Sequence, residues 1–414
     1  MPLLNKLRAV SADDPRAASL ARLRLAITAF FALDGFVFAG WVVRIPAVKA
    51  QTGASASDLG LALLGVSAGA VITMMLTGRL CRRFGSHAVT VACGVLLPLT
   101  VILPPLTHSP LTLGLVLLAF GAAYGGINVA MNSAAVDLVG ALRRPIMPSF
   151  HAAFSLGGMV GSGLGGLVAA HLTPTKHLMA IATLGLIVTA CAAPTLLRHP
   201  APVPADRTPQ NSPQKSTQNS PQNDRREPVR IDGRTRLLVL VFGLIALCTA
   251  YGEGALADWS ALHMEQDLHA HPGIAAASYS CFAFAMTIGR LTGTTLLERL
   301  GRTRTLVAGG LTGAFGMLLG SLAPTVWLAL IGFAITGIGL ANLFPVAIER
   351  AGALAGPTGV AAASTLGYGG MLLGPPAIGF MADWFSLSAA LTSVALLAAV
   401  AATIGFATRR VATN

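Results

Sequence analysis

Apolar runs of about twenty residues recur along this chain, with short polar breaks between them. At about 1.5 Å of rise per residue, a helix of that length crosses a hydrocarbon core roughly 30 Å thick. Lipid offers no partner for backbone N–H and C=O groups, so spans of this kind must be helical. The sequence therefore predicts an all-α integral membrane protein. The twelve predicted spans are residues 25–46, 57–78, 88–107, 111–138, 149–170, 177–197, 237–260, 274–297, 305–324, 326–348, 358–382 and 387–407.

Composition excludes several other classes of protein. The 414 residues are 54% hydrophobic and only 11% charged, whereas soluble domains carry about 25% charged residues. The net charge of +12 could favour nucleic acid, but the basic residues do not cluster with aromatic ones, and there are only four Tyr and four Trp. We expect a lipid bilayer and no nucleic acid around the chain. The five cysteines lack metal-ligand spacing, and we find no P-loop, zinc motif or nucleophile elbow, so we expect no metal, no cofactor and no enzyme activity.

The distribution of Lys and Arg predicts the orientation of the chain. With the N-terminus inside, all but four of the 28 basic residues fall on the inner side. The exceptions are Lys49 and Lys176 in outer loops, and Arg44 and Arg290 within predicted spans. Because basic residues concentrate in cytoplasmic loops, both termini are predicted to be cytoplasmic.

The predicted spans fall into two groups of six, separated by a polar segment at residues 199–236. This segment is rich in Pro, Gln, Asn and Ser and contains QNSPQ twice. Such a composition cannot bury a core, so we predict a disordered cytoplasmic linker. The domains are then an N-terminal six-helix bundle at 1–198 and a C-terminal six-helix bundle at 237–414.

The two halves carry similar sequences at corresponding places. Residues 83–85, after the second span, match residues 299–301, after the eighth, at an offset of 216 residues. The same offset sets GAAYGGINVAM, from Gly121, opposite GIGLANLFPVA, from Gly337. Secondary transporters are built from paired halves of this kind, with a site between them at the middle of the membrane.

The loop after the second span, GRLCRRFGSH, resembles the major facilitator superfamily pattern G-x-L-x-D-R-x-G-R-R. Arg83 follows the pattern, whereas Arg82 stands where the family has an acid. The corresponding loop after the eighth span keeps the acid as Glu298, followed by Arg299. In the family these loops latch helices and gate the conformational change by charge pairing, which implies gating roles for Arg83, Glu298 and Arg299. The alternative is that the basic residues only fix topology.

Two other spans indicate a branch of that superfamily. Span five reads GGMVGSGLGG, close to the antiporter pattern G-x-x-x-G-P-x-x-G-G, although such glycines also serve helix packing. Span four lacks the arginine and glutamine of drug antiporters and is similar to the fucose-permease-like branch, where a carboxylate and an asparagine lie four residues apart. Asn128 and Asn132 take those two places. The resemblance implies a bacterial inner-membrane transporter related to sugar permeases, in a largely uncharacterised branch.

Charged side chains within the spans are few, and each costs about 2.5–3.5 kcal/mol at the membrane centre. Asp34, near the middle of span one, is our first candidate for a proton-binding carboxylate; the alternative is a structural Asp bonded to a helix neighbour. Arg290 in span eight needs a partner, either Asp34, Glu253 or an anionic substrate. We assign Glu253 to proton coupling and Arg290 to substrate binding, against a purely structural ion pair. At the outer rim, Arg44 could reach water or Asp258, so this pair is either a gate or a surface ion pair.

Uncharged polar residues complete the predicted site. Asn128, Asn132 and Asn342 can hydrogen-bond a polyol or a neighbouring helix. His151, near the inner end of span five, either titrates near neutrality within the site or lies at a loop edge. We assign all four residues to substrate binding.

We predict a secondary active transporter that is proton-coupled, functions as a monomer, and moves a small polar organic solute, such as a sugar-like compound, by alternating access. An efflux antiporter for drugs or metabolites is the nearest alternative, supported by the glycine-rich span five and opposed by the missing arginine of span four. A membrane receptor or scaffold that kept the fold without transport is the third.

Overall fold

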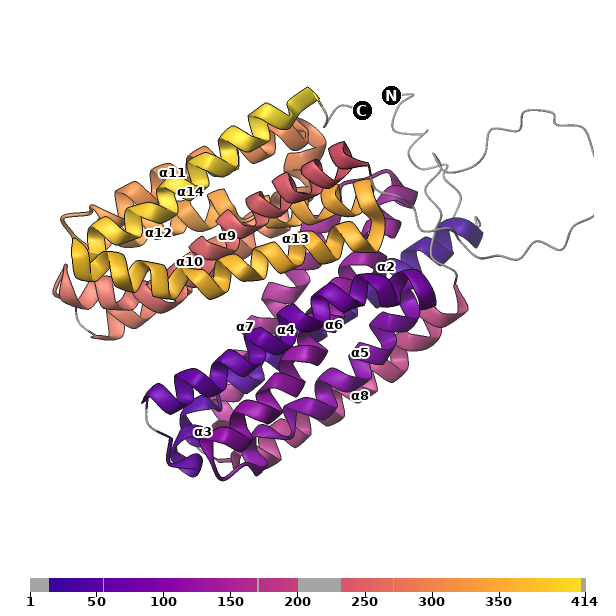
Figure 1. Ribbon diagram of the computed structural model, residues 1–414, viewed down its shortest axis with the longest axis horizontal. Helices are drawn as coiled ribbons and strands as arrows, with labels where there is room; N and C mark the ends of the chain where they lie inside the picture. The colour runs from indigo at the N-terminus through magenta and orange to yellow at the C-terminus, as the bar shows by residue number, and fades with distance from the viewer. Residues whose placement is uncertain (1–14, 55, 170, 200–231, 271, 411–414) are drawn as a thin grey trace, which may run out of the picture.

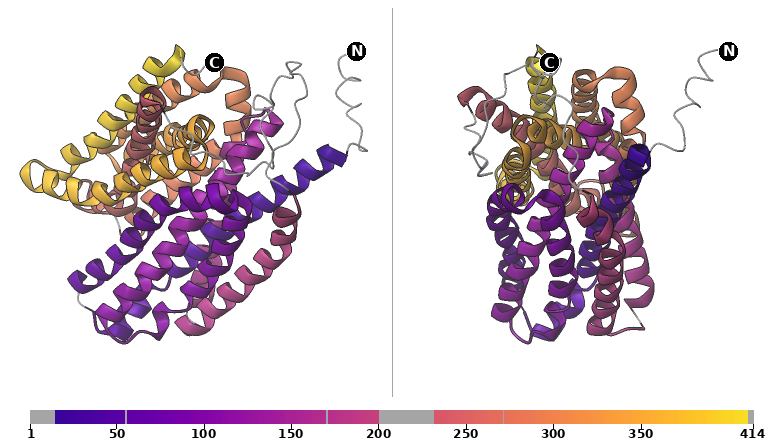
Figure 2. Two further views of the ribbon diagram at one scale, coloured as in Figure 1. Left: turned by 45° about the vertical axis from the view of Figure 1, so that its right-hand side comes forward. Right: turned by 90° about the vertical axis from the view of Figure 1, so that its right-hand side faces the viewer.

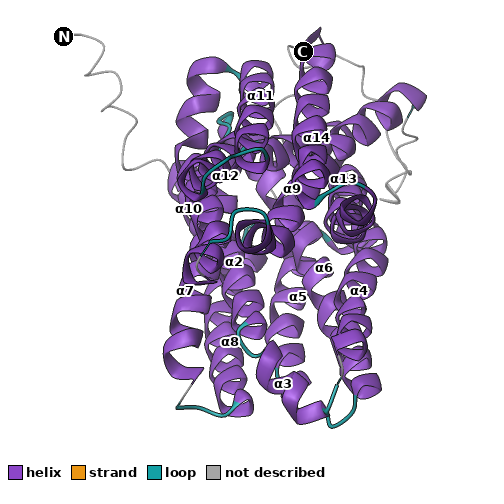
Figure 3. Ribbon diagram, turned by 90° about the vertical axis from the view of Figure 1, so that its left-hand side faces the viewer, coloured by secondary structure: helices purple, strands orange, loops and turns teal. Residues whose placement is uncertain are grey.

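The computed structural model describes residues 15–54, 56–169, 171–199, 232–270 and 272–410. Within these ranges the chain forms helices, turns and loops and no strand (Figure 3). The all-α prediction is therefore confirmed. Most of the predicted linker at 199–236 lies outside the described residues.

The first half of the chain forms one helical bundle (Figure 1). Its helices are α2 (Pro15–Val42), the short α3 (Ile45–Thr52), α4 (Ala56–Phe84), α5 (Ser86–Val101), the 3₁₀ turn η1 (Pro104–Leu106), α6 (Pro110–Leu142), α7 (Met147–Ala169) and α8 (Pro174–Arg198). α4 packs along α6, α2 along α7, and α5 along both α6 and α8. Phe30, Trp41 and Phe120 are fully buried in this core, so the largest apolar side chains hold the helices together.

The second half forms a similar bundle beside the first (Figures 1 and 2). Its helices are α9 (Gly233–Gln266), α10 (Pro272–Leu300), α11 (Arg302–Ser321), α12 (Val326–Leu340), α13 (Leu343–Trp384), α14 (Leu387–Ala407) and the 3₁₀ turn η3 (Thr408–Arg410). α9 begins four residues before the predicted span because the Asp232 side chain caps it, accepting a 3.1 Å hydrogen bond from the Thr235 amide.

α13 contributes two membrane spans rather than one. Its backbone is not helical at Ala355 and Gly356. The two arms fold back on each other, since Gly352 lies against Val360 and Gly359 lies against the Ala351 carbonyl. The first arm continues the span begun by α12, and the second arm is a separate span.

Twelve spans can be traced in the described chain. Eight segments are long and apolar enough to cross a membrane, and one of them, Val326–Ala382, includes α12 and both arms of α13. Together with α7, α10 and α11, which pack within the two bundles, these segments make up the twelve predicted spans.

The packing of the two bundles repeats the offset found in the sequence. A side chain at Gly121 would meet the Val66 carbonyl where α6 crosses α4, and one at Gly337 would meet the Phe282 carbonyl where α12 crosses α10. Both members of the second pair lie 216 residues after those of the first. The glycines are therefore needed in both halves, because only their lack of a side chain lets the helix backbones come this close.

The bundles meet at the end of the molecule where the arginines gather, which we call the basic end. Near this end, Arg82 on α4 donates a hydrogen bond to Thr358 on α13, Gly352 lies against Val136, and Gly293 lies against Pro148. Further hydrogen bonds join the bundles near the middle of the spans, where Asn128 donates to Tyr368 and Arg290 donates to Ser155. Figures 1 and 2 show the bundles separating towards the opposite end.

Replacing Gly121 by Val is expected to lower the free energy of unfolding by about 1–3 kcal/mol, because the added side chain forces α6 away from α4. Thermal unfolding of the purified protein in detergent measures the change. Gly163→Val is the matched control, since a side chain at Gly163 meets open space. Equal stability of the two variants would contradict the close crossing.

Candidate functional site

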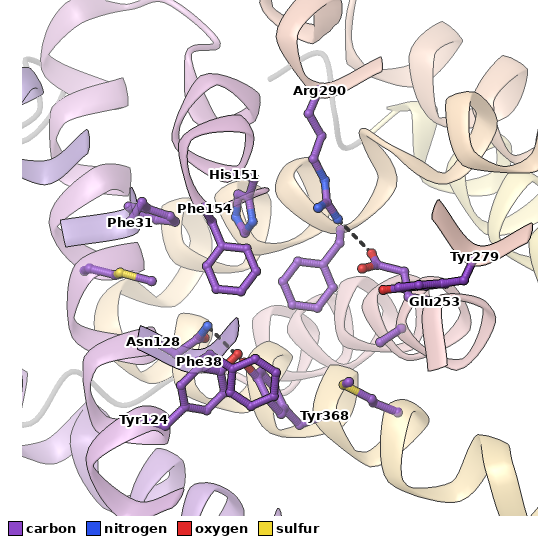
Figure 4. Close-up of a pocket in the computed structure, with 14 residues that line it drawn as sticks. Phe31, Phe38, Tyr124, Asn128, His151, Phe154, Glu253, Tyr279, Arg290 and Tyr368 are labelled. Atoms are coloured by element: carbon purple, nitrogen blue, oxygen red, sulfur yellow. Dashed lines mark hydrogen bonds and ion pairs between the residues drawn. The ribbon is translucent and has the colours of Figure 1, made fainter. Parts of the chain in front are cut away.

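A cavity of about 230 Å³ lies between the bundles, near the middle of the spans (Figure 4). Pockets for drug-sized ligands enclose roughly 300–1,000 Å³, so this one suits a small solute. The first bundle contributes Phe31, Phe38, Tyr124, Asn128, Met131, His151 and Phe154 to its wall. The second contributes Ala250, Glu253, Tyr279, Arg290, Phe344, Tyr368 and Met371.

Aromatic rings form much of the wall and fix its shape. Tyr124 stacks on Phe38 with ring centroids 4.9 Å apart, and Tyr368 meets Tyr124 edge-on at 6.0 Å. Figure 4 shows these three rings grouped on one side of the cavity. Such faces pack against the apolar surface of a bound solute, while the tyrosine hydroxyls remain able to hydrogen-bond.

Arg290 and Glu253 form an ion pair in the cavity wall, with 2.8 Å between Nη2 and Oε1. Arg290 also donates to the Ser155 hydroxyl of the first bundle at 2.8 Å, and its Nε donates to the Ala341 carbonyl at 3.4 Å. These contacts offset the cost of holding a guanidinium away from water. Of the partners that the sequence allowed for Arg290, the structure selects Glu253 over Asp34.

The carboxylate of this pair is the member more accessible to a solute. The Glu253 side chain is 29% exposed and that of Arg290 only 8%. The guanidinium is engaged on three sides, whereas the described contacts use only one Glu253 oxygen. The cavity therefore presents a hydrogen-bond acceptor more readily than a cation.

Asp34 lies on α2 behind the cavity wall. Its side chain is fully buried, and neither carboxylate oxygen has a hydrogen-bond partner in the described structure. It does not line the cavity, although Phe31 and Phe38, one helical turn away on either side, both do. A buried carboxylate without partners is costly when it is ionised.

The three asparagines predicted to bind substrate are placed differently. Asn128 lines the cavity and donates to the Tyr368 hydroxyl at 3.2 Å. Asn132, one turn further along α6, is fully buried and donates to the Asn128 carbonyl at 2.7 Å. Asn342 donates to the Gly289 carbonyl at 3.0 Å and fixes the start of α13 against α10. Only Asn128 therefore contributes to the cavity wall.

His151 belongs to the cavity wall and not to a loop edge. Its ring lies between those of Phe31 and Phe344, with centroid distances of 5.3 Å and 5.7 Å. Its Nε2 atom is buried and has no hydrogen-bond partner in the described structure. The ring therefore carries a buried polar atom in an otherwise aromatic part of the wall.

Glu298 joins the two bundles at the basic end, but its partner is Arg144 at the end of α6. The carboxylate lies 2.7 Å from Nη2 and 2.8 Å from Nε of Arg144. Arg82, which replaces the acid of the family pattern, also bonds across the interface. Arg83 is exposed and lies over the ring of the next residue, and Arg299 is exposed as well. The arginines that join the bundles are thus not the two that the motif indicated.

At the opposite end, Arg44 turns into the first bundle. It is buried where α2 gives way to α3, and it donates to His177 Nδ1 at 2.8 Å and to the Val168 carbonyl at 3.4 Å. Asp258 is exposed on α9 of the other bundle. The contacts of Arg44 with His177 and Val168 tie together helices of one bundle.

Sequence reasoning missed the tyrosines. Only four occur in the chain, and three of them, Tyr124, Tyr279 and Tyr368, line the cavity. Their scarcity, and their position within apolar spans, was a usable signal. Ser155 and Arg144 carried no such signal, because each is recognisable only by the residue it reaches in the other bundle.

Two pseudo-symmetric six-helix bundles around a central cavity define a membrane transporter of the alternating-access class. The family model described as Major Facilitator Superfamily matches residues 25–257 and 242–413. The chain therefore belongs to the major facilitator superfamily.

Three relatives match along most of their length. An uncharacterised MFS-type transporter of Yersinia pestis is 35% identical over 373 residues, which is 89% of this chain and 91% of that protein. An uncharacterised transporter of Sinorhizobium fredii is 32% identical over 91% of this chain and 96% of its own. The membrane protein MosC of Rhizobium meliloti is 26% identical over 92% and 89%.

Solved structures share the fold at low sequence identity. The fucose:proton symporter FucP of E. coli has a TM-score of 0.72 at 16% identity, covering 92% of this chain and 97% of that one. The proton:xylose symporter XylE has a TM-score of 0.73 at 13% identity, covering 94% and 95%. At this level of identity the likeness shows the fold alone.

Glu253→Gln is expected to destabilise the protein, because it leaves the Arg290 guanidinium buried without a counter-charge. Arg290→Gln leaves only a partly exposed carboxylate and should cost less. The double variant should be more stable than the sum of the single effects predicts, by about 0.5–3 kcal/mol. Thermal unfolding of all four proteins in detergent gives the coupling, and strictly additive effects would contradict a direct interaction.

Proposed function

We propose that this protein is a proton-coupled secondary transporter that moves a small, hydroxyl-bearing organic solute through the cavity between its bundles. The observation that carries the proposal is Asp34, a carboxylate buried without a partner directly behind the cavity wall. A transporter that binds and releases a proton needs such a group, and a purely structural role would normally provide it with a hydrogen bond.

Proton binding at Asp34 couples to solute binding through charge. With the proton bound, the middle of the first bundle carries no uncompensated charge, and the bundles can change arrangement at low electrostatic cost. Loss of the proton leaves a negative charge in an apolar setting. Glu253 is the second coupling residue, since Arg290 holds one of its oxygens while the other is open to the solute.

The wall of the cavity favours hydrogen-bond donors on the solute. The accessible Glu253 oxygen is an acceptor, and two further polar atoms of the wall residues, Asn128 Oδ1 and His151 Nε2, are buried without a partner. Aromatic faces suit a solute with an apolar ring surface. Hydroxyl groups on a compact ring meet both requirements, and an anion would be repelled by the carboxylate that it meets first.

The orientation follows from the basic end. Because Lys and Arg concentrate on the cytoplasmic side of membrane proteins, the basic end and both termini are cytoplasmic, in the inner membrane of a bacterium. The bundles are joined there by Arg144 with Glu298 and by Arg82 with Thr358. This arrangement is then the one closed to the cytoplasm, and a single chain holds the whole pathway.

The fold-sharing proteins agree with this proposal. FucP is a fucose:proton symporter, and XylE is a proton:xylose symporter. Both combine a proton with a small hydroxyl-rich solute, the same combination that the cavity and Asp34 support here.

A ligand-stabilisation screen tests the solute class. We expect neutral hydroxyl-rich probes such as L-fucose, D-xylose or myo-inositol to raise the unfolding free energy, by about 2.7 kcal/mol at a hundred times the dissociation constant. Gluconate and a lipophilic cation are the comparison ligands, and Glu253→Gln should weaken the response. Stabilisation by gluconate alone would indicate an anion site, and by the lipophilic cation alone an efflux antiporter.

Asp34→Asn is expected to abolish accumulation of the stabilising solute against its gradient, because the amide cannot carry the proton. Exchange of labelled for unlabelled solute should persist, since the cavity wall is unchanged. Transport into proteoliposomes with an imposed pH gradient measures both. The control is Glu265→Gln, which alters an exposed carboxylate at the end of α9. Normal uphill uptake by Asp34→Asn would refute proton coupling at this residue.

A further inference from the structure

Asp34 shares one face of α2 with two residues that line the cavity. Phe31 lies three residues before it and Phe38 four residues after it, a spacing that places all three on neighbouring positions of the helix surface. Both phenylalanines reach the cavity, whereas Asp34 has no exposed surface. Other side chains must therefore cover the carboxylate on the cavity side.

Two tyrosines of the cavity wall lie near Asp34. The hydroxyl groups of Tyr124 and Tyr368 are both close enough to Asp34 to interact with it electrostatically. Both rings line the cavity, Tyr124 stacked on Phe38 and Tyr368 edge-on to Tyr124. In Figure 4 the three rings lie together beside Asn128, on the side of the cavity away from Arg290.

The two tyrosines differ in the bundle that carries them. Tyr124 is on α6, in the same bundle as Asp34, Phe38 and Asn128, so these residues keep their mutual positions when the bundles move as units. Tyr368 is on the second arm of α13, in the other bundle. It reaches across to accept the 3.2 Å hydrogen bond from Asn128. Any rearrangement of the bundles therefore moves Tyr368 relative to Asp34.

We propose that Tyr368 is a lid that closes the proton-binding Asp34 of one bundle with a side chain of the other. In the present arrangement its ring and the bond to Asn128 keep the cavity from reaching the carboxylate. Movement of the bundles withdraws the lid, so the carboxylate can exchange its proton only at a defined stage of transport. This inference rests on the proposed function, because it takes Asp34 as the proton site.

Carbodiimide labelling measures access to Asp34 without any transported solute. Dicyclohexylcarbodiimide adds to a protonated carboxyl group: the carboxyl oxygen bonds to the central carbon of the reagent, and the proton passes to a nitrogen. Peptide mass spectrometry gives the labelling rate at Asp34, with Asp34→Asn as the blank. We expect Asp34 to be labelled about tenfold faster in Tyr368→Ala than in the unaltered protein. A tenfold change corresponds to a decrease of about 1.4 kcal/mol in the free energy needed to expose the carboxyl group.

Tyr279→Ala is the matched control, because it removes another cavity tyrosine of the second bundle, one whose electrostatic partners are Glu253, Arg290 and Asp258. It should label at the unaltered rate. Tyr368→Phe keeps the ring and should label at a rate between those of Tyr368→Ala and the unaltered protein. If Tyr368→Ala does not fold, Asn128→Ala replaces it, since loss of the anchoring bond should also speed labelling. Equal rates for Tyr368→Ala and the unaltered protein, or equal acceleration by Tyr279→Ala, would overturn the lid.

The labelling result is independent of the proposed function. Faster labelling in Tyr368→Ala, together with normal uphill transport by Asp34→Asn, would keep the lid and refute proton coupling. Unchanged labelling, together with loss of uphill transport in Asp34→Asn, would refute the lid and keep proton coupling.

Discussion

Charge held away from water is the constraint on which the centre of this molecule depends. The second bundle meets it with a direct ion pair, in which Arg290 is bonded to Glu253 and further held by Ser155 of the first bundle. The first bundle carries Asp34 with no hydrogen-bond partner in the described structure. One bundle therefore compensates its central charge with a neighbouring side chain, whereas the carboxyl group of the other is buried without such a partner.

Close packing of helices at glycine residues holds each bundle together. Gly121 and Gly337 let α6 approach α4 and α12 approach α10, so each bundle is held together by backbone contact at equivalent points. Because these crossings stabilise the bundles internally, each bundle can act as a unit. The contacts between the bundles include the exposed pair of Arg144 and Glu298. Such a pair contributes little in water and can be broken during a rearrangement.

Much of the fold follows from the sequence, because apolar run length and the 216-residue repeat are properties of the chain alone. Asp34, Glu253 and Arg290 could also be singled out from the sequence, since a charged residue within an apolar span is conspicuous wherever its side chain packs. The amides were less predictable. Asn128 reaches the cavity while Asn342 bonds α10, because an amide serves a solute or a helix equally well and only packing decides.

Contacts between the bundles could not be read from the sequence for a related reason. The family pattern drew attention to Arg83 and Arg299, but a helix repeats every 3.6 residues, so a neighbouring arginine points to a different side. Arg82 thus reaches α13 while Arg83 remains exposed. Tyr368 and Asn128 are separated by 240 residues, and their bond exists only because the bundles meet. The residues that distinguish one arrangement of the bundles from another are therefore those that local pattern describes least well.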